Sequence, residues 1–303
     1  MFVWRLLAGT FACVLLASSV VRAQDFPIRV QEASGRNLVF DTAPRRIVSL
    51  VPVATEILFS LGEGARLVGR SRFDDYPPEA ALIPDVGDAI RPSVETVLLR
   101  DPDLVILVGG FDNGASVREL VRLGIPHLVV VFNTLEDLQT NIVLLGRILG
   151  REEQAGTLWE QIDREIESVR AAVEGKPRPW VYYDVGYPPA FTAGAGSYLD
   201  ALLSVAGGQN VFGDLSAAAP RVSLEAILAR DPDVIIYPVG TNGPPHVEAP
   251  GDRPGWEHLR AVRSGSVLEV PSELLHRLGP RVGEAAKVLA LALHPEIGGA
   301  QFP

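Results

Sequence analysis

The sequence predicts an α/β protein of two lobes joined by one long, rigid helix. Three observations predict it: short apolar runs alternate with helical patterns, one long segment has an uninterrupted helical period, and one stretch of sequence occurs twice. Strands that alternate with helices form parallel sheets covered by those helices. The 303 residues, 47% of them hydrophobic, are enough for two lobes of ordinary size.

The first lobe is predicted over residues 24–150. It begins with a loose apolar alternation over 28–40 around Ser34 and Gly35, which indicates a leading hairpin. After the hairpin, apolar runs predict strands and the segments that follow them predict helices. The strands are expected at 47–50, 104–108 and 127–132, and the helices at 55–61, 115–123 and 135–149.

A connecting helix is predicted over 152–173, within a linking segment at 151–176. Apolar side chains recur there at helical spacing, and the helix should end at Gly175 and Pro177. The second lobe, over 177–303, resumes the alternation. Its elements are expected at 180–184, 198–205, 234–237 and 267–270.

An internal repeat supports two equivalent halves. Residues 93–110 align with 223–240 at an offset of 130, with 9 of 18 positions identical. In both copies Asp-Pro follows a helical pattern and precedes an apolar run, as at the end of a helix. Equivalent halves face each other across a cleft, and such interfaces are favoured places for small-molecule sites.

The first 23 residues have the pattern of a cleaved signal peptide. Arg5 precedes an apolar run that ends before Arg22 and Ala23. An uncleaved anchor is the rival interpretation, but a bilayer span needs about 20 apolar residues. The only cysteine, Cys13, lies inside the run rather than at the start of a mature chain, which disfavours a lipoprotein. We expect an exported, periplasmic protein.

Charge and motifs exclude several classes of function. The chain has 27 Lys and Arg against 37 Asp and Glu, and this net charge of −10 disfavours nucleic acid as a partner. The serine nucleophile motif Gly-x-Ser-x-Gly is absent, and the five histidines have no metal-ligand spacing. The stretch from Gly194 to Ser197 indicates a turn that starts a helix, with Ser197 as its cap. We therefore expect a binding protein with no metal site and no resident cofactor, rather than an enzyme.

Several motifs resemble one known family. Residues 45–62, 75–80, 207–212 and 279–281 resemble the periplasmic substrate-binding proteins of ATP-driven importers for cobalamin, haem and ferric siderophores. The cobalamin-binding members are the most similar, because Asp75-Tyr76-Pro77-Pro78 and residues 188–192 look like their two pocket loops. The resemblance implies the helical-backbone, class III fold, with one large ligand in the cleft between the lobes.

The resemblance also implies six ligand-binding residues. Tyr76 and Phe191 match aromatic positions that pack on the corrin ring, and Glu273 and Arg277 match an acid and an arginine of the pocket. The loop after the first strand would present backbone to the ligand at Pro52 and Val53. Each aromatic residue could instead fill the core of its own lobe, and either charged residue could instead belong to a surface ion pair.

The chain departs from the cobalamin binders at three positions. Ala89, Val108 and Ala219 stand where those proteins have tryptophans that line the pocket. Small side chains there would widen the pocket, so the ligand could be a different corrinoid, a bulkier siderophore or haem. For haem, Tyr76 or His276 could bind the iron, although a lone histidine is more often a surface residue.

Glu95 and Glu225 occupy equivalent positions of the repeat. Each follows a serine cap at the start of a predicted helix, where a carboxylate favourably meets the positive helix end. The resemblance adds a docking role, in which each glutamate meets arginines on one subunit of a dimeric permease.

These observations predict a monomeric periplasmic protein that carries a corrinoid to an inner-membrane permease dimer with its ATPase subunits. Haem or a ferric siderophore is the alternative ligand. An exported α/β enzyme that uses Glu273 and His276 as acid and base is a remote alternative.

Overall fold

The computed structural model describes residues 26–88, 92–109, 114–240 and 248–298, so the predicted signal peptide and Ala89 lie outside the described residues. The chain begins with the predicted hairpin, in which β1 (Ile28–Gln31) pairs antiparallel with β2 (Asn37–Phe40). Gly35, in the turn between them, has a φ of 83°, a conformation that favours glycine. The predicted leading hairpin is confirmed.

The first lobe contains a four-stranded parallel sheet in the order β4-β3-β5-β6. One of its two central strands, β5, is an unbroken apolar run that is buried on both faces, as expected for a covered parallel sheet. The elements of this sheet and its helices are β3 (Ile47–Ser49), α1 (Pro52–Ser60), β4 (Leu67–Arg70), α2 (Val94–Leu98), β5 (Leu104–Val108), α3 (Gly114–Arg122), β6 (His127–Val130) and α4 (Leu135–Leu149).

The second lobe contains a five-stranded sheet in the order β11-β10-β7-β8, with β9 also paired to β7. All its pairs are parallel except that between β7 and β8. Its elements are β7 (Trp180–Gly186), β8 (Phe191–Thr192), α6 (Tyr198–Val205), β9 (Gln209–Asn210), α7 (Leu224–Arg230), β10 (Val234–Val239), α8 (Arg260–Arg263), β11 (Val267–Pro271), α9 (Ser272–Leu275) and α10 (Val282–Leu293). Short 3₁₀ turns lie at Gly64–Arg66, Pro78–Leu82, Pro250–Asp252, Trp256–His258 and Pro295–Ile297.

The repeat corresponds to equivalent structure in the two lobes. The strand order β9-β7-β10-β11 reproduces β4-β3-β5-β6, and the repeated segment runs from α2 to β5 in one lobe and from α7 to β10 in the other. Ser93 caps α2 and Ser223 caps α7 in the same way. In each case the serine hydroxyl accepts a hydrogen bond from the backbone N–H three residues later. The prediction of two α/β lobes is confirmed.

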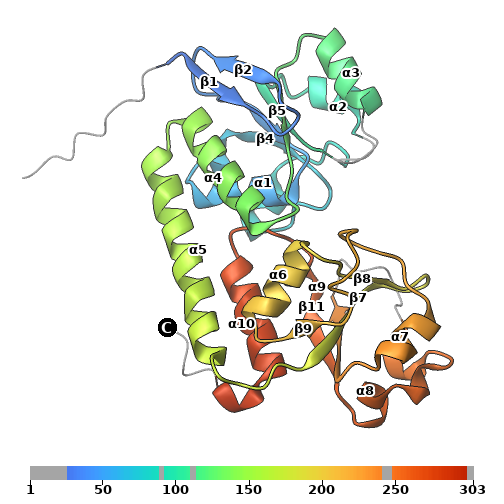
Figure 1. Ribbon diagram of the computed structural model, residues 1–303. Helices are drawn as coiled ribbons and strands as arrows, with labels where there is room; N and C mark the ends of the chain where they lie inside the picture. The colour runs from blue at the N-terminus through green and yellow to red at the C-terminus, as the bar shows by residue number, and fades with distance from the viewer. Residues whose placement is uncertain (1–25, 89–91, 110–113, 241–247, 299–303) are drawn as a thin grey trace, which may run out of the picture.

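The predicted connecting helix is α5 (Glu152–Val173), with the bounds expected from the sequence. At 1.5 Å per residue its 22 residues span roughly 33 Å. Figure 1 shows α5 running along one side of both lobes, beside α4 in the first and α10 in the second. Its buried face presents Ala155, Ile162, Ile166 and Val169 to one apolar core that includes side chains of both lobes.

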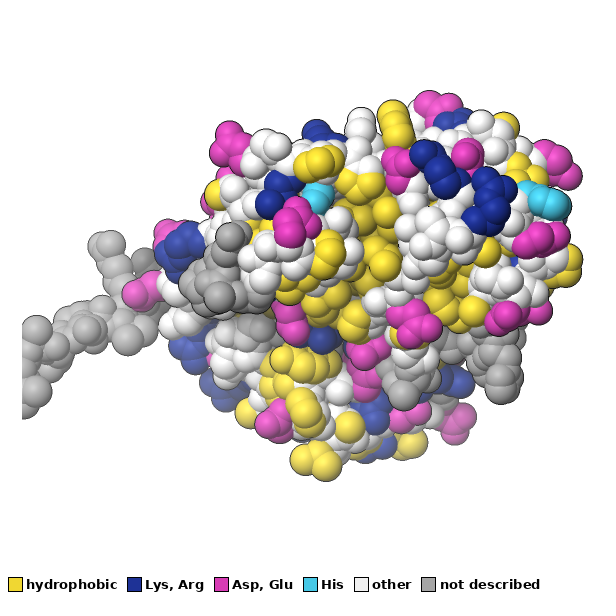
Figure 2. All heavy atoms as spheres, turned by 90° about the horizontal axis from the view of Figure 1, so that it is seen from below, with side chains coloured by type: hydrophobic (Ala, Val, Ile, Leu, Met, Phe, Trp, Pro, Cys, Tyr) yellow, Lys and Arg dark blue, Asp and Glu magenta, His cyan; other side chains and the backbone are white. Residues whose placement is uncertain are grey.

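The surface visible in Figure 2 mixes both signs of charge with apolar side chains, and no continuous basic patch is seen among the coloured residues of this face. Within the described ranges, every helix is too short or too polar to cross a lipid bilayer.

Candidate ligand-binding cleft

A cleft with a volume of about 380 Å³ lies between the lobes. The first lobe forms most of its wall with residues at or just beyond the carboxyl ends of its parallel strands. Ligands of open α/β sheets bind at this end of the strands, where the loops diverge. The residues of this wall are Leu50, Val51, Pro52 and Val53 after β3, Ser71 and Phe73 after β4, Asp88, Val108 of β5 and Phe132 after β6.

The second lobe closes the cleft with Tyr198, His276 and Leu278. Tyr198 begins α6, and its backbone N–H crosses between the lobes to donate a 2.9 Å hydrogen bond to the carbonyl of Asn133. The lining combines Phe73, Phe132 and Tyr198 with aliphatic side chains and few polar groups. Such a surface binds flat or apolar ligands by area burial and aromatic contact.

Pro52 and Val53, which were predicted to meet the ligand, lie in the cleft wall. They form the first turn of α1, whose N-terminal N–H groups have no intrahelical acceptor. Of the three substituted tryptophan positions, Val108 also lines the cleft, whereas Ala219 is exposed outside its lining.

Tyr76 and Arg277 lie beside the cleft but are outside its lining, and both take part in contacts between the lobes. Tyr76 is 41% exposed, and the guanidinium carbon of Arg281 lies 3.8 Å from the centre of its ring. Arg277 forms an ion pair with Asp75 and donates a 2.9 Å hydrogen bond to the carbonyl of Phe73. The sequence left open a surface ion pair for Arg277 without naming its partner, and its acidic partners here, Asp75 and Glu56, come from the other lobe.

Phe191 and Glu273 also lie outside the lining of this cleft. Phe191 is partly buried in β8, where it pairs with Gly186 and forms a bridge to Arg221. Glu273 is partly buried in the first turn of α9, next to Ser272. Of the six predicted residues, two therefore lie in the wall of the cleft and four lie outside its lining.

The sequence analysis missed Phe73, Phe132, Tyr198 and Leu278 as cleft residues. A signal for Phe132 was present, because it ends the apolar run predicted as a strand at 127–132, and the carboxyl ends of parallel strands meet at one edge of the sheet. Phe73 had no such signal, because β4, the strand that precedes it, was not predicted. No local pattern marked Tyr198 or Leu278, which reach the cleft only through the arrangement of the second lobe.

His276 opens to the cleft, with its ring centre 6.0 Å from that of Tyr183. Desolvation by the surrounding atoms lowers the pKa of its imidazole. The ring is therefore neutral over a wider pH range than a free histidine, which is the state that can bind a metal ion. Among the described residues, no group of three or more His, Cys, Asp or Glu is placed to hold a metal ion.

Glu95 and Glu225 are both exposed in the first turns of α2 and α7. Hydrogen bonds from its own backbone N–H and from Ser223 lower the pKa of the Glu225 carboxyl. Figure 1 shows α2 and α7 on the side of the molecule away from α5, one on each lobe. Both carboxylates are thus exposed to solvent and open to a partner.

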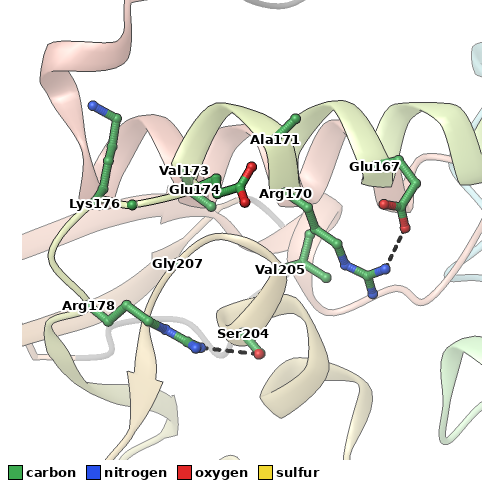
Figure 3. A pocket seen from close by; sticks show the side chains of 11 residues that line it. Glu167, Arg170, Ala171, Val173, Glu174, Lys176, Arg178, Ser204, Val205 and Gly207 are labelled. Atoms are coloured by element: carbon green, nitrogen blue, oxygen red, sulfur yellow. Dashed lines mark hydrogen bonds and ion pairs between the residues drawn. The ribbon is translucent and has the colours of Figure 1, made fainter.

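A second hollow, of about 560 Å³, lies at the C-terminal end of α5, between that helix and α6. Figure 3 shows its charged side chains, of which Arg170 pairs with Glu167 and Arg178 donates to Ser204. Lys176 forms an ion pair with Glu296 at 3.2 Å. Because these cations already have partners, the hollow offers little to an anionic ligand, and the apolar cleft is the better candidate site.

Known proteins of similar sequence include substrate-binding proteins. The chain is 26% identical, over 95% of its length and 98% of the other protein, to the uncharacterized ABC transporter substrate-binding lipoprotein YvrC of Bacillus subtilis. It is 32% identical to the vitamin B12-binding protein of Salmonella typhimurium, over 83% of this chain and 91% of that protein.

A solved structure shows the same fold. The periplasmic heme-binding protein RhuT of Roseiflexus superposes with a TM-score of 0.74 at 27% identity, covering 84% of this chain and 99% of the other. Residues 47–274 match the family described as periplasmic binding protein, a stretch that includes both sheets and α5. The chain therefore belongs to the periplasmic binding protein family, whose members here serve transport and are not enzymes.

Proposed function

We propose that this protein captures a corrinoid in the cleft between its lobes and delivers it to an ABC permease. The observation that carries the proposal is the cleft itself, where three aromatic side chains and the first turn of α1 surround an apolar space. A corrin ring is broad and flat, so it gains from aromatic walls and needs no protein ligand on its metal. Similarity to the vitamin B12-binding protein supports the same ligand class.

The size of the cleft bears on how such a ligand would sit. Pockets for small molecules measure about 300–1,000 Å³, and this one is near the lower limit. A corrinoid would therefore enter with one edge and leave the rest of the molecule between the rims of the two lobes. The rim contains Tyr76 and Arg277, which is consistent with their predicted roles in ligand binding.

Binding by the purified protein tests this proposal. Titration with cyanocobalamin should give one saturable site per chain, with no chemical change in the recovered ligand. Cobinamide, which lacks the lower nucleotide loop, distinguishes recognition of the ring from recognition of the loop. Haemin and a ferric hydroxamate are the competitors, and saturable binding of one of these with none of cyanocobalamin would contradict the corrinoid assignment.

Haem is the second candidate, and His276 is the observation that favours it. Its imidazole opens to the cleft and has a lowered pKa, so it can offer a neutral nitrogen to iron. If haem is the ligand, haemin should give a sharp Soret band that His276→Ala abolishes. His258→Ala is the matched control, because that histidine is exposed on the second lobe, outside the cleft lining.

We also propose that Glu95 and Glu225 dock the protein onto the permease. The repeat places one exposed carboxylate on each lobe, an arrangement that suits a partner built from two equivalent subunits. Glu95→Ala/Glu225→Ala should keep ligand affinity and lose stimulation of the transporter ATPase. Glu136→Ala/Glu153→Ala is the control, because these glutamates are also exposed in first turns of helices. Normal stimulation by the first variant would refute the docking role.

A further inference from the structure

A cluster of charged and aromatic side chains joins the two lobes beside the cleft. Arg281, just before α10, donates to both oxygens of Glu56 on α1, through Nε at 3.0 Å and Nη2 at 2.8 Å. Glu56 is only 2% exposed, and paired hydrogen bonds of this kind are among the strongest contacts between charged side chains. The first lobe is thereby bound to the second through a buried carboxylate.

The same guanidinium also covers Tyr76. Its carbon lies 3.8 Å from the centre of the ring, which is the distance of a stacked cation–π contact. Arg281 therefore holds two parts of the first lobe at once, the helix that lines the cleft and the loop at its rim. Tyr76 is 41% exposed, so its ring is supported by Arg281 and still accessible.

A second arginine strengthens the connection. Arg277 pairs with Asp75, donates to the carbonyl of Phe73, and has Nη1 3.8 Å from Glu56. Phe73 lines the cleft and is 52% exposed. The loop over residues 73–76 is thus fixed from the second lobe through its backbone as well as its side chains.

The turn between the two arginines packs closely against α1. A Cβ atom added to Gly279 would lie 3.3 Å from an oxygen of Glu56 and 3.6 Å from Val53. A larger residue there would have to shift the Glu56 carboxylate by a few tenths of an ångström, and so would disturb its pairing with Arg281. This close approach keeps Arg281 within reach of its acceptor.

The second lobe contains a similar group that stays within that lobe. Tyr-Pro-Pro occurs at 76–78 and again at 187–189, and the guanidinium carbon of Arg253 lies 4.2 Å from the ring centre of Tyr187. Arg253 pairs with Asp184 at 2.6 Å, and both side chains are almost fully buried. Both groups therefore consist of a buried carboxylate, an arginine and a tyrosine. They differ in that the contacts of Arg281 cross between the lobes, whereas those of Arg253 do not.

We propose that Arg281 is a positioning residue that fixes the aperture of the cleft and the orientation of Tyr76. It acts as an interlobe clasp, defined here as Arg281 and Arg277 with Glu56, Asp75 and Tyr76. The clasp determines the separation of the two walls whichever ligand is bound. Its effect on ligand selection rests on the proposed function, because it acts through Tyr76 at the rim of the same cleft.

The distance between the lobes in the ligand-free protein tests the clasp directly. Spin labels can be attached to cysteines introduced at Gln139 on α4 and Ala229 on α7, both exposed, in a full-length Cys13→Ser background. Double electron–electron resonance measures the distance between the two labels, and the parent protein should give one narrow distribution of that distance. In Arg281→Met the distribution should broaden and shift by several ångströms, because the lobes lose their link beside the cleft.

Two further variants keep the test decisive if the buried charge left by Arg281→Met disturbs folding. Glu56→Gln/Arg281→Met removes both charges and should broaden the distribution in the same way. Arg36→Met is the matched control, because Arg36 pairs with Glu32 inside the first lobe at 2.9 Å, and it should leave the distribution unchanged. An unchanged distribution in the folded double variant would overturn the clasp.

Cyanocobalamin binding provides a separate readout of the effect on Tyr76. Arg281→Met should weaken binding about tenfold, and the same change in a Tyr76→Ala background should have little further effect. Equal losses in both backgrounds would show that Arg281 does not act through Tyr76. If the parent protein binds only haemin, the same cycle is measured with haemin, and the distance measurement still decides whether the clasp exists.

Discussion

Asp101 and Asp231 occupy equivalent positions of the repeat, and both have left-handed backbone conformations, with φ of 46° and 38°. Each follows a helix and precedes a strand, so the chain turns in the same way in both lobes. Two residues further on, the carboxylates of Asp103 and Asp233 accept hydrogen bonds from backbone N–H groups at the start of a neighbouring strand. The equivalence of the lobes thus extends from strand order to single backbone dihedral angles.

Substitution at Asp101 should show the cost of this conformation. A β-branched residue is strained at positive φ, so Asp101→Val should lower the free energy of unfolding by about 1–2 kcal/mol, whereas Asp101→Gly should keep or slightly raise it. Asp231→Gly should be less favourable than Asp101→Gly, because the Asp231 carboxylate accepts from the backbone N–H of Arg260. Urea unfolding measures the three variants. Equal stability of Asp101→Val and the parent would contradict the assigned backbone conformation.

The Asp74 carboxyl should make stability depend on pH. Burial raises its pKa to about 6, although Ser71 and Thr55 donate hydrogen bonds to it. Between about pH 4 and 6 the folded protein keeps a proton that the unfolded chain has lost, so the free energy of unfolding falls as pH rises through this window. The loss is up to about 3 kcal/mol at the ordinary conversion of pKa shifts into free energy.

Asp74→Asn removes this titration while keeping the size of the side chain. Unfolding free energies measured from pH 4 to 7 should therefore fall less steeply for the variant than for the parent. Asp85→Asn is the control, since Asp85 is exposed and close in sequence. Parallel pH profiles for Asp74→Asn and the parent would show that Asp74 does not titrate in this range.

The contributions of Arg253 and Asp184 to the free energy of unfolding should depend strongly on each other. Desolvation raises the pKa of the Asp184 carboxyl and Arg253 counteracts it, so removal of the arginine leaves a buried, unpaired acid. Arg253→Met should cost about 3–5 kcal/mol of stability, and Asp184→Asn/Arg253→Met should recover part of it. The measurement is again urea unfolding. Additive losses in the double variant would mean that the two side chains do not compensate each other.

The two longest helices, α4 and α5, could be predicted from the sequence, because each has several helical periods and clear ends. The helix at 135–149 has its predicted bounds, with a capping box at Thr134 and Asp137 and a left-handed Gly150 at its C-terminal end. Ser197 caps α6 as predicted, with its hydroxyl accepting from the amide of Asp200 at 3.2 Å. The strands β4, β8 and β9 were not predicted, because such short segments have no measurable period. The helix α10 was not predicted either, because its second half is apolar at nearly every position and shows no amphipathic period.

The site was less predictable than the fold. Pro52 and Val53 could be placed near a ligand because they follow an apolar strand and begin a helix. The clasp could not be predicted, because Glu56 and Arg281 are far apart in the sequence and only the packing of the lobes brings them together. Each of these charged residues, taken alone in the sequence, resembles a solvated surface residue.

The central claim is that the apolar cleft holds the ligand, and the affinity of Phe73→Ala for cyanocobalamin tests it most directly. Phe73 lines the cleft while 52% exposed, so a bound ring should cover it, and loss of its side chain should weaken binding by about 10- to 100-fold. Leu82→Ala is the control, since Leu82 is 85% exposed and outside the cleft lining, and its affinity should match that of the parent. Undiminished affinity in Phe73→Ala, with one ligand still bound per chain, would contradict the claim.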